Sequence, residues 1–268
     1  MSTPAAPVQI ESRGPVDILT LARPQKLNAL NVEMARTLHD YFSTAASRTQ
    51  VRVIVLRAQG KEFCAGADLD SAVFASTGPG RAQRQLELQH LYSGLIRHMR
   101  ACPQPIIALI NGAACGAGFS LALASDVRYA APEARMNAAY LRVGLGGCDM
   151  GAGYLLPRLV GLSVASEFLL TGRFMSAQRA LAAGLVSEIV PAESLLDTGL
   201  ALAEDMLKAS PMGLRMTKDA LNLAIDAGSL DAGLALEDRQ QVILLGTADH
   251  QEAVAAFKQR RPPQYRDQ

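Results

Sequence analysis

The sequence contains no tryptophan, few other aromatic residues and no excess of charge of either sign. Aromatic residues make up 5% of the 268 residues, and 26 Lys+Arg against 25 Asp+Glu leave a formal net charge of +1. A near-neutral chain without a block of basic residues lacks the electrostatic field that attracts nucleic acid or an anionic membrane surface. We therefore expect neither partner, and a hydrophobic fraction of 49% predicts a folded globular protein.

Cysteine is equally scarce, and no two of the four cysteines have CxxC spacing. This density is far below that of a disulfide scaffold, so we expect a reduced, cytoplasmic protein. No cysteine or histidine pair has the spacing of metal ligands, and no metal site is predicted. The N-terminus lacks a basic start followed by an apolar run, so we expect no secretory signal.

One long uncharged run extends from Ala101 to Ser125 and would be long enough to span a bilayer. The alternative is a buried strand, a turn and a helix. Pro103 and Pro105 open the run, and Gly112 interrupts its middle. This punctuation favours the strand–turn–helix interpretation.

Patterns typical of strands and helices alternate over the first two thirds of the chain, which predicts an α/β fold with largely parallel strands. Asn31 is the expected N-cap of the first helix, and residues 71–80, small and rich in Gly and Ser, predict a mobile loop. Strands are expected over 16–21, 53–56, 106–110 and 127–130, and helices over 31–48, 86–99 and 116–125.

The last third of the chain is almost wholly helical in pattern. We therefore expect a core with the candidate site over residues 1–198 and a helical C-terminal region over residues 199–268. The helices of the last third are expected over 195–209, 212–226, 230–245 and 249–260.

A glycine-rich turn over residues 112–120 joins an expected strand to an expected helix that begins near Gly116 and Ala117. A helix start offers unpaired N–H groups and a partial positive charge, which suit an anion or a developing oxyanion. The alternative is a tight turn in which glycine permits close packing.

Three other glycine motifs can be compared with this turn. A phosphate-binding P-loop needs Gly-Lys-Ser/Thr, which is absent, and the glycines do not have the spacing of a dinucleotide fingerprint. Ser120 lies in a sequence close to a nucleophile elbow, but Ala122 replaces the last glycine and Ser120 lies ten residues past Ile110. A serine hydrolase would also need a downstream histidine, and only His250 is available. It stays a minor alternative.

Asp149 is the carboxylate in a second glycine-dense stretch, residues 143–151, just before an expected helix. It could be the N-cap of that helix, which is a common and stabilising role for Asp. It could instead accept and return a proton at a reacting carbon.

Several motifs occur together in one order: Arg23–Leu30 (RPQKLNAL), Phe63–Leu69 (FCAGADL), the turn at 111–118, Leu170–Arg173 (LTGR) and Gly184–Val186 (GLV). Together they resemble the enoyl-CoA hydratase/isomerase (crotonase) family from about residue 8 to residue 263. The resemblance implies a core of repeated ββα turns arranged as a spiral. It also implies a helical C-terminal region that drives formation of a homotrimer, usually within a dimer of trimers.

The resemblance implies an acyl-CoA substrate whose thioester carbonyl lies between two backbone N–H groups, at the positions of Ala67 and Ala117 here. Two such donors stabilise an enolate-like oxyanion. Phe257 and Arg260 match positions that hold the adenine and phosphate end of CoA from a neighbouring subunit. No cofactor is implied beyond CoA as part of the substrate. The other implied substrate-binding positions are Ala65, Gly66, Asp68, Leu69, Ser120 and Tyr140.

The departures from the family pattern bear on the reaction. Hydratases of the family carry two glutamates where this sequence has Ser120 and Tyr140, and neither side chain is a strong base near neutral pH. Dienoyl-CoA isomerases carry an aspartate where Asp149 falls, if one extra residue is accepted in 144–148. One carboxylate is enough to move a double bond, so the resemblance predicts an isomerase-like enzyme with Asp149 as acid/base. The alternative is a non-catalytic acyl-CoA-binding protein that keeps the two N–H groups.

Overall fold

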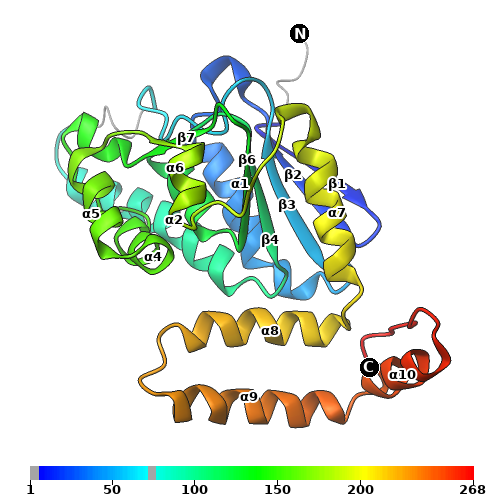
Figure 1. The fold of residues 1–268 in the computed structure, drawn as a ribbon. Helices are drawn as coiled ribbons and strands as arrows, with labels where there is room; N and C mark the ends of the chain where they lie inside the picture. Colours follow the sequence, from blue (N-terminus) through cyan, green and yellow to red (C-terminus); the bar gives the residue numbers. More distant parts are fainter. Residues whose placement is uncertain (1–5, 72–76) are drawn as a thin grey trace.

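A six-stranded sheet forms the centre of the computed structural model, which describes residues 6–71 and 77–268 (Figure 1). The strand order is β1-β2-β3-β4-β6-β9, and β1 and β2 are its antiparallel pair, while each other pair of neighbours is parallel. The α/β expectation is confirmed. The strands are β1 (Val8–Arg13), β2 (Val16–Leu21), β3 (Val53–Ala58), β4 (Ile106–Ile110), β6 (Val127–Ala130) and β9 (Glu188–Ile189).

Successive side chains of a strand point to opposite faces of the sheet. Both faces are buried in a hydrophobic cluster. Leu19 and Leu56 lie in the larger hydrophobic cluster with helices on one face, while Ile18 and Val55 lie in a second cluster on the other face. Helix α7 (Leu195–Leu207) covers the second face, against β3, β4 and β6. The first face is covered by α1 (Val32–Ser43), α2 (Arg81–Ala101) and α3 (Ala117–Ala124).

The side chain of Asn31 caps α1 as expected, accepting a hydrogen bond from the Met34 N–H at 2.9 Å. The helix ends at Ser43, earlier than expected, because the chain tightens into a short 3-10 helix at Ala45–Ser47. Further 3-10 segments include Pro24–Lys26 and Ala192–Ser194.

A second, three-stranded sheet begins immediately after β4 and carries the glycine-rich turn. Its order is β5-β7-β8, and an isolated bridge between Cys64 and Ala114 joins it to the segment after β3. It is surrounded by shorter helices. These elements are β5 (Ala113–Cys115), β7 (Arg135–Asn137), β8 (Met175–Ser176), the 3-10 helix at Ala139–Val143, α4 (Ala152–Val160), α5 (Leu162–Thr171) and α6 (Ala177–Ala182).

The uncharged run at 101–125 forms β4, β5 and α3, so the strand–turn–helix interpretation is confirmed. No helix in the described part of the chain is long and apolar enough to cross a membrane. Of the loop expected over 71–80, residues 72–76 lie outside the described residues.

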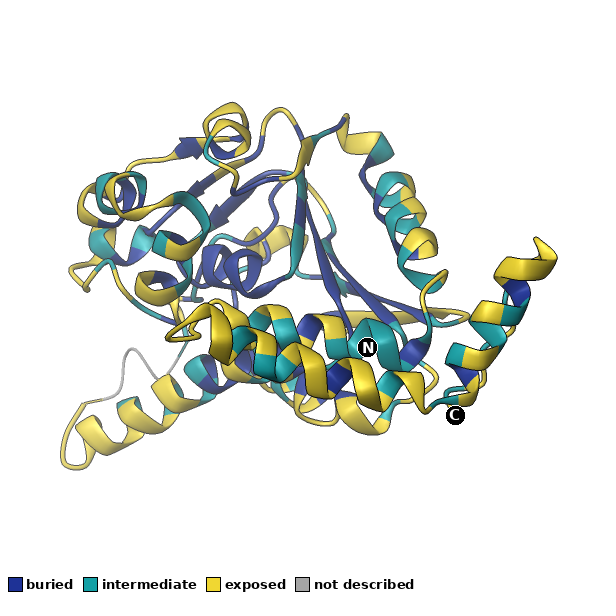
Figure 2. Cartoon of the chain, turned by 60° about the horizontal axis from the view of Figure 1, so that its bottom comes forward, coloured by how far each residue is buried: buried dark blue, intermediate teal, exposed yellow. Residues whose placement is uncertain are grey.

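The C-terminal region is helical as expected. The division after residue 198 falls inside α7, which packs on the sheet, and the chain leaves the core only at Ser210, the N-cap of α8. Helices α8 (Pro211–Ala224) and α9 (Leu230–Leu245) then lie side by side below the core, followed by α10 (Ala248–Gln259) (Figure 1). Much of this helix pair is exposed in the single chain (Figure 2).

Candidate active site

The segment after β3 holds Ala67 in a parallel bridge with Leu30. The Leu30 N–H donates to the Gly66 carbonyl at 2.7 Å, and the Asp68 N–H donates to the Leu30 carbonyl at 3.0 Å. These bonds use the groups on either side of Ala67, so the N–H of Ala67 itself is not engaged in the bridge. Ala67 lines a cavity of about 450 Å³.

Ala117 lines the same cavity and is the first residue of α3. The first N–H groups of a helix have no acceptor within the helix. Within residues 6–71 and 77–268, no backbone carbonyl accepts a hydrogen bond from the N–H of Ala67 or Ala117. The structure therefore brings the two expected oxyanion donors to one cavity at a helix N-terminus.

Two glycines allow the segments that carry these donors to lie against each other. Gly66 has φ +106°, and a Cβ there would lie 3.1 Å from the Cys115 carbonyl oxygen. A Cβ on Gly118 would lie 2.6 Å from the Cβ of Cys64. The backbones can approach this closely only without side chains at these two positions.

Asp149 lines the same cavity and is the one carboxylate among its described lining residues. Its Oδ1 accepts hydrogen bonds from the Gln89 side-chain amide at 2.5 Å and from the Met150 N–H at 2.7 Å. The helix-cap alternative is wrong, because α4 begins at Ala152 with Gly151 as its cap residue and without a side-chain cap bond.

Ser120 and Tyr140, the two positions that differ from the hydratase pattern, are hydrogen-bonded to each other. The Ser120 Oγ lies 2.6 Å from the Tyr140 hydroxyl, and Ser120 is fully buried while Tyr140 lines the cavity. Burial raises the pKa of the Tyr140 phenol above its ordinary value of 10, so the phenol stays protonated.

The serine-hydrolase alternative requires a histidine beside Ser120. The other hydrogen bond of the Ser120 hydroxyl goes to the Asp149 carbonyl, at 3.3 Å. All four histidines are described and none lines the cavity; His250 lies on α10. Ser120 therefore lacks the base that would activate it.

The remaining expected residues divide into two groups. Ala65, Gly66 and Leu69 line the cavity. Asp68 does not, because its carboxylate is buried in an ion pair with Arg23 at 2.8 Å. Phe257 and Arg260, at the end of α10, do not line the cavity either, and their role at the site of a neighbouring subunit stays a prediction.

Sequence reasoning did not find the wall that α2 contributes. Gln85, Gln89 and Tyr92 lie one or two turns apart on one face of α2 and line the cavity. Their spacing was the available signal, but it is equally typical of any solvent-exposed helix. The other lining residues that it missed are Arg81, Leu88, Gly116, Ala139, Val143, Leu145 and Met150.

A larger cavity of about 730 Å³ lies between α2, α4 and α8. Three ion pairs involve its lining residues: Asp126 with Arg100 at 3.1 Å and with Lys218 at 2.8 Å, and Arg158 with Asp226 at 3.0 Å. Neither of the two unpaired alanine N–H groups faces it. In the part of the chain that the structure describes, no three His, Cys, Asp or Glu side chains cluster as metal ligands would.

Comparison with known proteins decides the family. The sequence profile described as enoyl-CoA hydratase/isomerase matches residues 11–268. The chain belongs to the enoyl-CoA hydratase/isomerase family. It is 40% identical over 255 residues to a probable enoyl-CoA hydratase of Mycobacterium bovis, covering 93% of this chain and 88% of the relative. It is 35% identical to 1,2-epoxyphenylacetyl-CoA isomerase of Escherichia coli over 247 residues, 92% of this chain and 93% of the relative.

Solved structures agree. The enoyl-CoA hydratase of Bacillus anthracis superposes with a TM-score of 0.91 at 30% identity, covering 98% of this chain and all of the other. The enoyl-CoA hydratase of Mycobacterium smegmatis superposes with a TM-score of 0.88 at 30% identity, covering 97% of this chain and 98% of the other. The crotonase fold expected from the motifs is confirmed, and the protein is an enzyme of this family.

Proposed function

We propose that this enzyme moves a proton on an acyl-CoA thioester and shifts a double bond, rather than acting as an efficient hydratase. The main observation in support is that Asp149 is the carboxylate among the described residues lining the cavity, which Ala67 and Ala117 also line. Two N–H donors and one carboxylate are the parts that enolate formation and reprotonation require.

In the proposed reaction the thioester carbonyl oxygen accepts hydrogen bonds from the Ala67 and Ala117 N–H groups. The Oδ2 of Asp149, which accepts no hydrogen bond from the described residues, takes a proton from one carbon of the acyl chain. The electron pair of that C–H bond moves onto the carbonyl oxygen as a dienolate. The proton on the Asp149 carboxyl group exchanges with solvent in part, and Asp149 then donates a proton to another carbon of the conjugated system. The double bond has moved, and no atom is gained or lost.

The names of relatives support either reaction class, since one is an isomerase and 2,3-dehydroadipyl-CoA hydratase of Escherichia coli is 36% identical. The Ser120–Tyr140 pair favours isomerisation. A hydratase must hold and deprotonate a water molecule, and two mutually bonded neutral hydroxyls offer no base for that step.

The test is a panel of 2-enoyl-, 3-enoyl- and dienoyl-CoA thioesters incubated with the enzyme in deuterium oxide. We expect double-bond migration with deuterium incorporation, detected by mass spectrometry. Asp149→Asn should keep acyl-CoA binding and lose turnover by roughly 10²-fold or more. The control Asp205→Asn, which removes an exposed carboxylate on α7, should leave the rate unchanged. Full activity of Asp149→Asn would contradict the assignment.

The alternative of a non-catalytic acyl-CoA-binding protein makes a different prediction. It would show thermal stabilisation by acyl-CoA thioesters with neither product nor deuterium incorporation across the panel. Any turnover that Asp149→Asn removes would eliminate it.

We further propose that the active form is a homotrimer or a dimer of trimers, in which Phe257 and Arg260 hold the adenine and phosphate end of CoA bound to a neighbour. Arg pairs well with phosphate. Large apolar side chains on α8 and α9 support a subunit contact, because they are exposed in the single chain. The exposed apolar residues are Leu221, Leu223, Leu230, Leu234, Val242, Ile243 and Leu245. Light scattering would measure the mass of the assembly.

The four cysteines are unpaired, which supports a reducing, cytoplasmic location.

A further inference from the structure

Helix α3 is short and wholly buried, and its first residue is Ala117. Its length of eight residues corresponds to about 12 Å. The last four carbonyls of a helix have no partner within the helix, and in a buried helix they need donors from elsewhere. The C-terminal end of α3 therefore requires side-chain donors, while its N-terminal end presents an N–H to the cavity.

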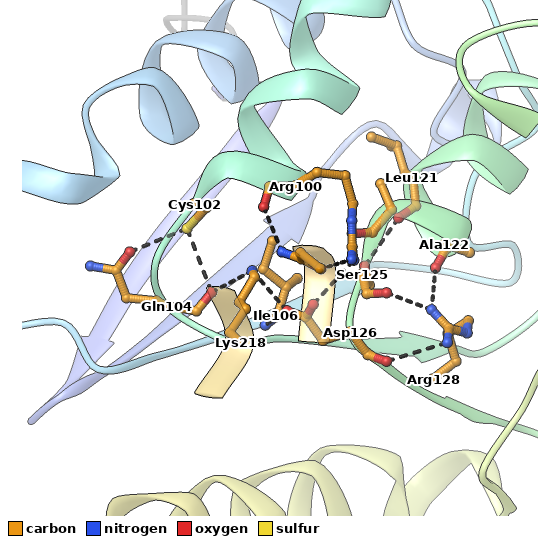
Figure 3. A network of polar contacts seen from close by, with 12 residues as sticks. Arg100, Cys102, Gln104, Ile106, Leu121, Ala122, Ser125, Asp126, Arg128 and Lys218 are labelled. Atoms are coloured by element: carbon orange, nitrogen blue, oxygen red, sulfur yellow. Dashed lines mark hydrogen bonds and ion pairs between the residues drawn. The ribbon is translucent and has the colours of Figure 1, made fainter. Parts of the chain in front are cut away.

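Arg128 donates to one of these four carbonyls and to the carbonyl of the C-cap residue Ser125 (Figure 3). Its Nη1 donates to the carbonyls of Ala122 at 3.2 Å and Ser125 at 2.5 Å. Its Nε donates to the Leu185 carbonyl at 2.7 Å, and its Nη2 to the Asp126 carbonyl at 3.3 Å. Among the residues that the structure describes, all the partners of this guanidinium are backbone carbonyls, and two of them belong to the last turn and C-cap of α3.

Arg100 and Ser125 complete the end of the helix (Figure 3). Arg100 Nη1 donates to the Ala124 carbonyl at 3.2 Å, and the Ser125 hydroxyl donates to the Leu121 carbonyl at 3.0 Å. Arg100 is itself held by the Asp126 carboxylate and by Asn222 of α8. Side chains thus occupy three of the last four carbonyls of α3.

Arg128 is a cation only 5% exposed, and in the described ranges no carboxylate lies within ion-pair distance of its guanidinium. Burial lowers its pKa to about 10, so it is still protonated at neutral pH. A buried cation without a paired anion is costly. The negative end of the α3 dipole is the compensating group that the structure provides.

We propose that Arg128, assisted by Arg100, is a positioning residue for the oxyanion donor Ala117 and acts through α3. The inference rests on the proposed function. A short helix whose C-terminal carbonyls are hydrogen-bonded by fixed side chains has a fixed axis. The direction of that axis determines where the Ala117 N–H points. The same contacts offset the negative end of the helix, so the field at its N-terminus favours an oxyanion.

The test uses hexanoyl-CoA that carries 13C at the thioester carbonyl. Infrared spectroscopy reports polarisation of the bound carbonyl as a shift to lower frequency, and exchange of the α-hydrogens in deuterium oxide reports enolate formation. For Arg128→Met we expect at least half of the carbonyl shift to be lost. The exchange rate at saturation should fall by roughly tenfold, with KM changed less than about twofold. Arg128→Lys, which keeps the charge and part of the hydrogen bonding, should recover most of both.

A control variant separates positioning from general destabilisation. Tyr41 of α1 donates a buried hydrogen bond of 2.7 Å to Asp17 of β2, away from α3. Tyr41→Phe removes this bond and should leave the carbonyl shift intact. If Arg128→Met does not fold, Arg100→Met removes the donor to the Ala124 carbonyl from a partly exposed side chain and should lose part of the shift.

An unchanged shift in folded Arg128→Met, or in Arg100→Met where the first variant does not fold, would overturn this proposal. A wild-type protein that binds hexanoyl-CoA without any carbonyl shift would instead overturn the proposed function.

Discussion

The hydroxyl groups of Ser120 and Tyr140 lie 2.6 Å apart and satisfy each other inside the protein. Ser120 projects from the second turn of α3, and Tyr140 from the 3-10 helix at Ala139–Val143. In the hydratase pattern these two positions carry the carboxylates that handle water. Here a neutral pair replaces them, and Asp149 is the remaining acid in the cavity.

The first prediction concerns hydration. We expect the wild-type enzyme to hydrate crotonyl-CoA at least about 10²-fold more slowly than a hydratase that has both glutamates, because Ser120 and Tyr140 offer neutral hydroxyls in place of the two carboxylates. Loss of the absorbance of the conjugated enoyl thioester measures the rate. Hydration at the rate of that reference enzyme would show that the hydroxyl pair does not decide the reaction.

The second prediction concerns Gln89, whose amide donates to Asp149 Oδ1 at 2.5 Å. Gln89→Leu should lower kcat by roughly tenfold while the Kd for acyl-CoA changes little, because the carboxylate loses the contact that sets its orientation. Gln83→Leu, on the exposed side of the same helix, is the matched control. Equal rates for the two variants would mean that the Met150 N–H alone orients Asp149.

The third prediction concerns the close approach at Gly118, where a Cβ would lie 2.6 Å from the Cβ of Cys64. Gly118→Ala should lower the free energy of unfolding by about 1–3 kcal/mol through overpacking, and it should also reduce activity by displacing α3. Gly228→Ala is the control, since a Cβ there meets nothing within 4 Å. Urea denaturation measures the free energy of unfolding of both variants. A Gly118→Ala variant as stable as Gly228→Ala would contradict the packing argument.

The fourth prediction concerns pH and His98, which packs edge-on against His39 with ring centroids 4.6 Å apart. Burial, then the His39 ring and Arg97, hold the pKa of His98 below its ordinary value of 6.5. The unfolded chain therefore takes up this proton first as the pH falls. The stability associated with neutral His98 is complete above about pH 6.5 and is lost as the pH falls through the unfolded and then the folded pKa.

Thermal unfolding at about pH 7.5 and about pH 5.5 tests this. The wild type should lose more stability between the two values than His98→Asn, which has no titrating group at this position. An equal loss in both proteins would assign the acid sensitivity to other groups.

Local patterns predicted the elements whose signal lies within their own residues. Asn31 as a cap, β4 as an apolar run and α10 as a periodic helix all lie within about two residues of their expected starts. Strands β5, β7, β8 and β9 were not predicted, because each has only two or three residues and no period of its own. Such strands exist through their partners, and pairing partners cannot be read from a short segment. Strand β1 was not predicted either, and its residues after Val8 are exposed.

The site divides in the same way. The motifs around Ala67 and Ala117 are short and contiguous, so the resemblance to the family pointed to both as candidates, and both line one cavity. Gln89 and Asp149 are sixty residues apart in sequence and meet only because α2 crosses the loop before α4. The sequence left Asp149 open between a cap and an acid, and the structure excludes the cap because Gly151 precedes α4.

The sequence by itself determined the fold class, the family and the chemical character of the site. The alternation of apolar residues, the glycines at close approaches and the missing glutamates are all local facts. Only the tertiary structure decided which groups share a cavity and which charges support it. Arg128 shows the reason: its partners Ala122 and Leu185 come from opposite directions along the chain. Hydrogen bonds of a buried side chain depend on distances in space, which sequence separation does not encode.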